Sequence, residues 1–412
     1  MSTADTADTP SAADTADAAT FAARAADVDE TLPVDGTRGT LVGRIWDSAE
    51  AGPAVVTVRD GALHDITAAF PTVRDLCEQP DPAAAVAAAP RRYVAPLADV
   101  LANTAATPRD PQLPWLLTPV DLQAVKAAGV TFVDSMLERL IEERVRGEAA
   151  GAEEVRTAIL DALGGRLTRV RPGSPEAARL KEILVAQGLW SQYLEVGIGP
   201  DAEIFTKAQP LSAIGTAAEI GVLTCSRWNN PEPEVVLAVT SRGAVVGATL
   251  GNDVNLRDIE GRSALLLPKA KDNNASCAIG PFLRLFDATY GMDDVREATV
   301  RLRVEGTDGF TMDGTSSLSA ISRDPEELVG QLTGPHHQYP DGAVLFLGTM
   351  FAPTADRDEP GMGFTHHRGD LVRISTESLG GLVNRVEASE KCEPWTFGAA
   401  DLMRNLARRG LL

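Results

Sequence analysis

Three acidic residues of the sequence are spaced so that together they could bind a metal ion. Glu232 and Glu234 stand two residues apart at the start of a β-branched run, so in a strand both side chains point to one face. A second such run ends at Asp253, and a two-residue turn at Arg242-Gly243 would join the runs as a hairpin. This register pairs Glu234 with Gly251 and Glu232 with Asp253, which gathers the three carboxylates on one face.

The chemistry of such a cluster is that of a hard divalent cation. Clustered carboxylates repel one another unless protons or a cation separate them. The cluster offers only oxygen ligands, and no histidine occurs between residues 65 and 335, so we expect Mg²⁺ first, with Mn²⁺ as a substitute or Ca²⁺ next. The alternative is a solvated acidic strand end. Pro231 and Pro233 favour the metal site, because they stiffen the backbone on either side of Glu232.

Two neighbouring stretches add charged candidates. Lys271 lies in a polar stretch of a largely apolar region, where the alternative is an ordinary surface lysine. Residues 201–210 are predicted to form a strand that carries Glu203 and Lys207, and the alternative for Glu203 is a structural ion pair with Lys207.

Charge and composition narrow the class of protein. Asp and Glu number 58 against 38 Lys and Arg, a formal charge of −20, so neither nucleic acid nor an anionic membrane is expected as a partner. No apolar run reaches the roughly 18 residues of a membrane span. None of the four cysteines forms a C-x-x-C pair, which favours a cytoplasmic location. Residues 1–36 hold eight acidic residues against Arg24 and few aliphatic ones, which predicts a disordered acidic tail.

The remaining chain is predicted to form three parts of an α+β, mostly β, protein. Residues 37–115 hold short β-branched runs and form a small β-rich domain. Residues 193–412 hold short strands with Gly and Pro turns and form a larger, mostly β domain that carries the acidic cluster. Residues 116–192 are mainly helical. The helices expected there begin at Thr118-Pro119, run from about Asp134 to Arg146, cover Glu153–Leu163, and run from Ser174-Pro175 to Gly188.

Several of these stretches resemble motifs of the fumarylacetoacetate hydrolase superfamily, over about residues 118–412. The motifs are Glu-Ile-Phe-Thr-Lys-Ala-Gln-Pro (203–210), Pro-Glu-Pro-Glu (231–234), Gly-Asn-Asp-Val-Asn-Leu-Arg-Asp (251–258), Lys271 with Ile-Gly-Pro (279–281), Gly348-Thr349 and Gly369-Asp370. The resemblance implies a mixed β-roll C-terminal domain beside a smaller β-rich N-terminal domain. It also implies that Glu232, Glu234 and Asp253 bind Mg²⁺.

Other segments point to one branch of the superfamily. Residues 189–200, 269–277 and 395–412 resemble dehydratases of 2-keto-3-deoxy sugar acids. The resemblance implies such an acid as the substrate, and a homodimer or homotetramer as the assembly. The superfamily's hydrolases carry a His-Glu dyad on a helix, and the matching segment here, residues 129–139, has no histidine. C–C hydrolysis and decarboxylation remain alternative activities, and a non-catalytic sugar-acid sensor is a further alternative.

The resemblance and the chemistry of dehydration suggest roles for individual residues. Lys271 would take the proton from C3 if the site lowers its pKa, and Glu203 would protonate the departing C4 hydroxyl. Lys207, Thr349 and Arg257 are the candidate substrate-binding residues. Thr349 would offer its backbone N–H to the carboxylate, whereas Arg257 is also a candidate to brace the metal loop through Asp258 or Glu260.

Overall fold

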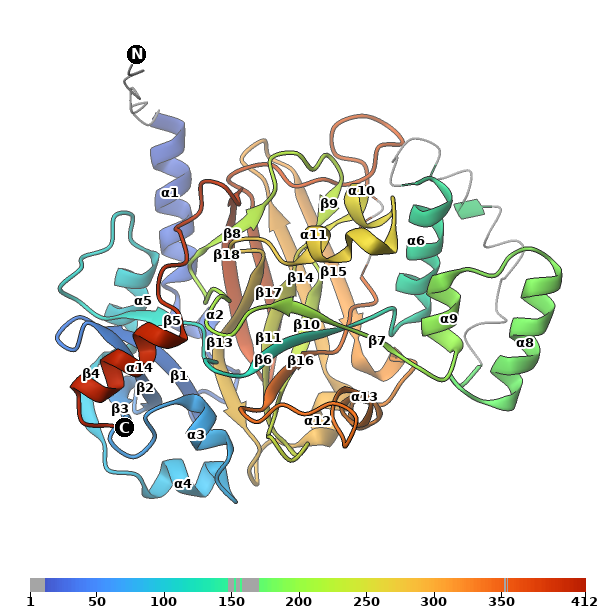
Figure 1. Ribbon diagram of the computed structural model, residues 1–412. Helices are drawn as coiled ribbons and strands as arrows, with labels where there is room; N and C mark the ends of the chain where they lie inside the picture. Colours follow the sequence, from blue (N-terminus) through green and yellow to red (C-terminus); the bar gives the residue numbers. More distant parts are fainter. Residues whose placement is uncertain (1–11, 147–151, 153–155, 158–169, 352, 354) are drawn as a thin grey trace, which may run out of the picture.

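An 11-stranded sheet dominates the computed structural model, which describes residues 12–146, 152, 156–157, 170–351, 353 and 355–412 (Figure 1). The strand order is β4-β3-β2-β1-β13-β11-β10-β16-β6-β7, and β5 pairs with β1. Their bounds are β1 Leu41–Asp47, β2 Gly52–Arg59, β3 Ala62–Asp65, β4 Arg92–Pro96, β5 Trp115–Leu117, β6 Ala124–Gly129, β7 Glu203–Ala208, β10 Pro233–Val239, β11 Val245–Asp253, β13 Cys277–Leu285 and β16 Ala343–Phe346. Because β1 pairs with β13, the sheet runs across the boundary predicted near residue 115.

A five-stranded sheet packs against this large one. It has the order β15-β14-β17-β18-β8, and a separate pair joins β9 and β12. The bounds are β8 Glu219–Val222, β9 Asn229–Asn230, β12 Asn255–Leu256, β14 Thr299–Glu305, β15 Thr311–Ser317, β17 Leu371–Thr376 and β18 Gly380–Ala388. In β14, Val300, Leu302 and Val304 are buried and alternate with more exposed residues, as expected for a strand with one face on a core. They share one apolar cluster with Leu237 and Leu250 of the large sheet. The mostly β, mixed fold predicted from the sequence is confirmed.

Helices cover the two ends of the molecule. Beside β1–β4 lie α3 Val73–Cys77, α4 Pro82–Ala88, α5 Leu97–Ala105 and α14 Ala399–Arg408 (Figure 1). At the opposite side lie α6 Val133–Arg144, α8 Pro175–Ala186 and α9 Gln192–Ile198 (Figure 1). The others are α10 Arg257–Glu260, α11 Leu267–Lys271, α12 Met292–Glu297 and α13 Pro325–Leu332, with 3₁₀ turns at Ala264–Leu266 and Leu318–Ala320. No helix in the described ranges is long and apolar enough to cross a membrane.

The prediction of a disordered tail is wrong for residues 12–36. They form α1 Ala12–Ala25 and α2 Val28–Thr31, whereas residues 1–11 lie outside the described residues. Phe21 is 4% exposed and packs in a cluster with Ala105 and Val383. Asp35 accepts two hydrogen bonds from Arg284, at 3.0 and 2.7 Å. One phenylalanine and several alanines therefore suffice to dock a segment that is too polar to form a core of its own.

The predicted helix start at Thr118-Pro119 is also wrong, because this segment is extended and leads into β6. Asp121, three residues after Thr118, serves another helix instead: its carboxylate accepts bonds from the backbone N–H groups of Val73 and Arg74, at 2.7 and 3.1 Å. These amides belong to the first turn of α3, where such donors lack partners within the helix.

Two other predicted helices are confirmed as α6 and α8. In α8, the Ser174 hydroxyl accepts from the N–H of Ala177 at 3.1 Å, and Gly188 follows the helix with a φ of +67°. The helix predicted over Glu153–Leu163 falls almost entirely outside the described residues.

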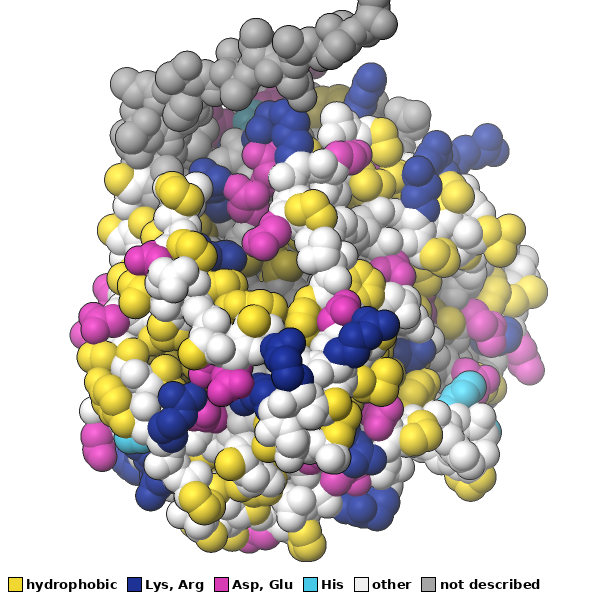
Figure 2. Space-filling model, turned by 60° about the vertical axis from the view of Figure 1, so that its left-hand side comes forward, with side chains coloured by type: hydrophobic (Ala, Val, Ile, Leu, Met, Phe, Trp, Pro, Cys, Tyr) yellow, Lys and Arg dark blue, Asp and Glu magenta, His cyan; other side chains and the backbone are white. Residues whose placement is uncertain are grey.

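Charged and apolar side chains are interspersed on the face that carries the N-terminal strands. Figure 2 shows acidic, basic and hydrophobic groups in alternation across this face, with a hollow near its centre. The formal charge of −20 is therefore not gathered into one acidic patch on this side.

Candidate metal centre and active site

Five strand ends of the large sheet meet at one place. β10 is antiparallel to β11 and β16, β16 is parallel to β6, and β6 is antiparallel to β7. The starts of β10 and β7 therefore lie beside the ends of β11, β16 and β6. The residues brought together there are Gly129, Glu203, Glu232, Glu234, Asp253, Gly348 and Thr349.

The predicted carboxylate register is confirmed. Glu234 pairs with Gly251, and the N–H of Asp253 donates to the carbonyl of Glu232 at 3.1 Å. Carboxylate oxygens of Glu232, Glu234 and Asp253 lie within 4.8 Å of one another, and all three residues are buried.

The predicted two-residue turn of this hairpin is wrong. The N–H of Thr240 donates to the carbonyl of Ala244, so the loop has three residues. A bulge between Ala238 and Val239 shifts the pairing by one residue and restores the register at the carboxylates.

Three cations surround the cluster. Lys271, at the end of α11, donates to Glu232 and to Asp253, the latter at 3.1 Å. Lys207 of β7 lies 2.8 Å from the other oxygen of Asp253. Arg139 of α6 donates to Glu232. These ammonium and guanidinium groups lie against Glu232 and Asp253 and offset part of the cost of burying their charge.

The pKa values of the two carboxylates in the hairpin move in opposite directions. Burial raises the pKa of Glu234, and the charges of Asp253 and Glu232 raise it further. Burial also acts to raise the pKa of Asp253, but Lys207 and Lys271 outweigh it, so this pKa lies below its ordinary value. Glu234 is therefore the member of this pair whose negative charge its surroundings stabilise less.

The pKa values of Lys271 and Glu203 are both raised. Burial lowers the pKa of Lys271, but the charges of Asp253 and Glu232 outweigh burial. Lys271 would need a lowered pKa to act as a base, and in this arrangement its pKa is raised instead. Burial raises the pKa of Glu203 more than Arg139 and Lys271 lower it, which suits a proton donor.

The donor set fits a hard divalent cation. It offers buried carboxylate oxygens, without nitrogen or sulfur ligands, in a group whose mutual repulsion a cation would relieve. Glu234 is already held in place, because one of its oxygens accepts the N–H of Gly348 at 2.6 Å. Glu232, Glu234 and Asp253 are the residues that could hold the ion.

A small cavity of about 20 Å³ lies beside the cluster. Its lining includes Lys271, Glu203, Thr349, Ser135 and Arg139. The space is close to that of one water molecule, so a larger ligand enters it only if side chains move. The proton-transfer candidates Lys271 and Glu203 thus border the same space as the carboxylates, as does Thr349.

Lys207 and Arg257, predicted to bind substrate, lie outside the lining of this cavity. Lys207 is fully buried, and besides Asp253 it donates to the carbonyls of Val254 and Lys271, at 3.1 and 2.6 Å. It lies beneath the cluster and braces it. The alternative for Glu203, an ion pair with Lys207, does not form, because Lys207 pairs with Asp253 instead.

Arg257 is 2% exposed and lies over the ring of Trp228, 4.1 Å from its centroid. Its guanidinium pairs with Glu138 at 3.2 Å. Asp258 is one of two candidates through which Arg257 could brace the metal loop. Its carboxylate instead accepts bonds from the Ser226 hydroxyl and from the N–H of Arg227, at 2.8 and 2.9 Å.

Arg139 is the site residue that sequence reasoning missed. It lines the cavity and reaches both Glu232 and Glu260, the latter at 3.5 Å. Ser135, one helical turn earlier, lines the same cavity. The spacing of four residues on a predicted helix was the available signal, because it places both side chains on one face.

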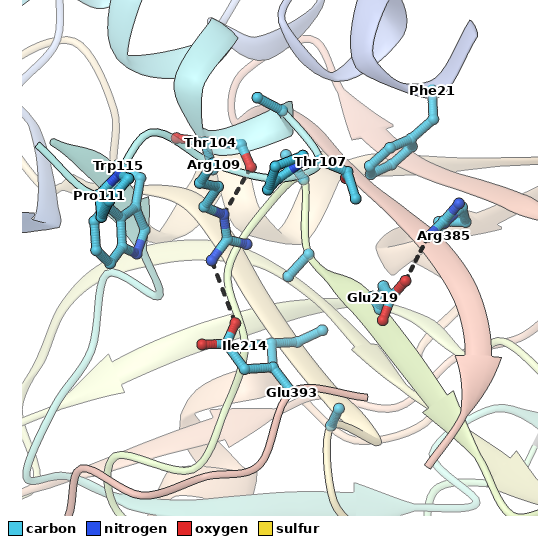
Figure 3. A pocket seen from close by; sticks show the side chains of 15 residues that line it. Phe21, Thr104, Thr107, Arg109, Pro111, Trp115, Ile214, Glu219, Arg385 and Glu393 are labelled. Atoms are coloured by element: carbon cyan, nitrogen blue, oxygen red, sulfur yellow. Dashed lines mark hydrogen bonds and ion pairs between the residues drawn. The ribbon is translucent and has the colours of Figure 1, made fainter. Parts of the chain in front are cut away.

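Larger hollows lie elsewhere in the molecule. One, of about 380 Å³, is bordered by Phe21, Arg109, Trp115 and Arg385 (Figure 3). Arg109 donates there to the carbonyl of Thr104 at 3.1 Å and to Glu393 at 3.4 Å, and Arg385 pairs with Glu219. The acidic residues described in its lining, Glu219 and Glu393, each pair with an arginine, whereas the smaller cavity borders three carboxylates that could hold one ion, so the chemistry points to the smaller cavity.

The sequence matches the family described as "Fumarylacetoacetate (FAA) hydrolase C-terminal" over residues 181–387, about half of the chain. The chain therefore belongs to the fumarylacetoacetate hydrolase family, and the resemblance noted in the sequence is confirmed. Among curated proteins it is similar to a "Probable 2-keto-3-deoxyxylonate dehydratase" of Haloferax volcanii, with 32% identity over 266 residues. That match covers 65% of this chain and 86% of the relative.

A second relative is the "2-dehydro-3-deoxy-D-arabinonate dehydratase" of Saccharolobus solfataricus, 31% identical over 195 residues. This match covers 46% of this chain and 60% of the relative. Among solved structures, "2-keto-3-deoxy-D-arabinonate dehydratase complexed with magnesium and 2,5-dioxopentanoate" has a TM-score of 0.58 and 19% identity. It aligns over 84% of this chain and 99% of that one, a likeness that shows the shared fold.

Proposed function

We propose that this protein is a Mg²⁺-dependent dehydratase that converts 2-keto-3-deoxy-D-xylonate (2-dehydro-3-deoxy-D-arabinonate) to 2,5-dioxopentanoate and water. The observation that carries the proposal is the buried group of Glu232, Glu234 and Asp253, with Lys271 and Glu203 around the same cavity. The names of the two curated relatives support the class of substrate.

The substrate explains why a cation and two proton-transfer groups belong together. It has a keto group at C2, a CH₂ at C3 and hydroxyls at C4 and C5. A Mg²⁺ ion held there, for which Mn²⁺ would substitute, would supply Lewis acidity toward the 2-keto acid and so would make its C3 protons more acidic. Glu232, Glu234 and Asp253 would hold the ion.

Lys271 and Glu203 are the residues that we assign to proton transfer. Lys271 takes a proton from C3, and the bond from C4 to oxygen breaks as Glu203 protonates the departing hydroxyl. The unsaturated keto acid then tautomerises to the C5 aldehyde. Lys271 becomes a better base once Glu232 and Asp253 are engaged by a cation, because burial is then the larger influence on its pKa.

Two other cavity residues suit substrate binding. The Arg139 guanidinium matches a carboxylate or hydroxyl group of the acid, and Thr349 offers its backbone N–H. Lys207 and Arg257 lie outside the cavity lining. They act through their ion-pair partners, which are Asp253 and Glu138. In this assignment Lys207 keeps Asp253 charged and in place.

A C–C hydrolase or decarboxylase on the same scaffold is the alternative. The described lining of the cavity contains no histidine, so the water-activating dyad of the hydrolases lacks one member. Incubation with 2-keto-3-deoxy-D-xylonate and Mg²⁺ separates the activities, with the product trapped by a semialdehyde dehydrogenase. One five-carbon semialdehyde supports the proposal, whereas two carbon fragments or CO₂ contradict it.

The assembly and location remain predictions. We expect a homodimer or homotetramer, which light scattering on the purified protein checks. A cytoplasmic location is checked by cell fractionation.

A further inference from the structure

Glu138 and Arg257 form an ion pair next to the cavity without lining it. The Arg257 guanidinium donates to the Glu138 carboxylate at 3.2 Å, and the two side chains are 2% and 12% exposed. Arg156 donates two further bonds to Glu138, at 2.8 and 2.7 Å. Arg257 also donates to the carbonyl of Pro353 at 3.2 Å and lies over the Trp228 ring. Such charge-assisted bonds between buried groups fix relative positions closely.

The pair connects two helices that serve the site. Glu138 lies on α6, and Arg257 begins α10, four residues after Asp253. The next residue of α6 is Arg139, which reaches Glu232 and also Glu260 on α10. Consecutive helical residues point about 100° apart, so α6 contacts α10 through two adjacent side chains. The contact of Glu138 with Arg257 lies outside the cavity lining, and the contact of Arg139 with Glu260 lies within it.

We propose that Glu138 is a positioning residue, which acts with Arg257 to aim Arg139 into the cavity. The inference rests on the proposed function only in that Arg139 binds the substrate acid. Glu138 is held by two guanidinium groups and does not line the cavity, so it does not contact the space in which a reacting atom would lie. Its chemical role is to fix the angle of α6 against the strand end that carries Asp253.

Kinetics of paired variants test this role. Glu138→Gln should raise KM for 2-keto-3-deoxy-D-xylonate by about tenfold, with a much smaller change in kcat, because misplacement weakens binding through Arg139. Arg139→Met should raise KM at least as much. The double variant should be no worse than Arg139→Met alone, since both changes remove the same interaction.

The control is Asp134→Asn, which removes an exposed carboxylate from the same helix and should leave KM and kcat unchanged. A collapse of kcat at constant KM in Glu138→Gln would make Glu138 a catalytic base and overturn the proposal. Multiplied effects in the double variant would also overturn it. Arg257→Lys, which alters the pair from its other side, replaces Glu138→Gln if that variant does not fold, and should give the same rise in KM.

Amide hydrogen exchange supplies a readout that needs no substrate. Exchange across Val133–Arg144 should quicken in Glu138→Gln and not in Asp134→Asn. Equal exchange in both variants would overturn the positioning role. If the wild-type protein turns over no keto-deoxy acid, the proposed function fails, while the exchange result still decides whether Glu138 holds α6.

Discussion

Gly129 and Glu203 face each other across β6 and β7, and a Cβ atom on Gly129 would overlap the Glu203 carboxylate. The glycine therefore leaves the space in which the proposed proton donor lies. Gly129→Ala should push the carboxylate aside and lower kcat by roughly ten- to a hundredfold. Stability should change little, because a flexible side-chain end can move. Steady-state kinetics check this.

The matched control for that change is Gly330→Ala on α13. A Cβ there meets nothing within 4 Å, so activity should stay normal. Normal kinetics in Gly129→Ala as well would show that the position of Glu203 does not limit the reaction.

Removal of the metal should abolish activity. The three carboxylates make a strong hard-ion site only together, so excess chelator should stop turnover and Mg²⁺ or Mn²⁺ should restore it. Glu234→Gln should weaken Mg²⁺ binding, measured by calorimetry, by at least about tenfold. Glu78→Gln changes a residue that bonds Ser241 at the other end of the same hairpin, and it should leave Mg²⁺ binding intact. Full activity in chelator would contradict the metal assignment.

The N-terminal segment should contribute to stability, in contrast to the expectation from composition. Phe21→Ala removes a ring that is 4% exposed and should lower the free energy of unfolding by about 3 kcal/mol. Urea unfolding measures the change. Val34→Ala, at a residue that is 80% exposed, should have little effect. Equal stability of Phe21→Ala and the wild-type protein would return residues 12–25 to the status of a loosely attached tail.

The carboxylate cluster could be predicted because strand pairing has a fixed period. Once a short turn joins the two strands, the residue that pairs with Glu234 is determined. The loop is one residue longer than predicted, but the bulge near Val239 shifts the pairing back by one residue. The prediction of Lys271 and Glu203 as site residues depended on the family resemblance, because a single charged residue forms no spacing pattern with others.

Other features depended on contacts that are distant in the sequence. Arg139 meets Glu232, 93 positions away, only because α6 packs beside the sheet. Thr118-Pro119 resembles a helix start, but the segment is not helical and the Asp121 carboxylate that follows it accepts the first backbone N–H of α3. Phe21 is buried against Ala105, Ala217 and Val383, and local composition cannot show that such a surface exists.

Stability should fall in acid as Asp370 becomes protonated. Burial acts to raise the pKa of Asp370, but hydrogen bonds from Arg357 and His366 outweigh it and lower the pKa to about 2. A carboxyl whose folded pKa is depressed stabilises the fold above its unfolded pKa, and this stability is lost as the pH falls from about 4 to about 2. The contribution is about 2 kcal/mol.

Asp370→Asn should therefore differ most from the wild-type protein at neutral pH, and the difference should shrink below pH ~4. Urea unfolding at several pH values checks it. Asp293→Asn, whose side chain is 95% exposed, is the control and should show no such trend. A difference that stays constant with pH would assign the effect of Asp370→Asn to packing alone.

Proton transfer is separable from metal binding at Lys271 and Glu203. Lys271→Met and Glu203→Gln should both still bind Mg²⁺, because neither residue is a proposed ligand, while kcat falls by about 10²–10⁴-fold. The matched controls are Lys269→Met on the same helix and Asp201→Asn beside Glu203, both at exposed residues, and both should remain active.

The two variants should differ in hydrogen exchange at C3 of the substrate. Without Lys271, the C3 hydrogens should stop exchanging with D₂O, because no base removes them. Without Glu203, exchange should continue while no semialdehyde forms, because only departure of the C4 hydroxyl is blocked. NMR of the substrate held with each variant and Mg²⁺ in D₂O reads both results. Exchange in Lys271→Met with none in Glu203→Gln would reverse the two roles, and normal turnover in either variant would remove that residue from the mechanism.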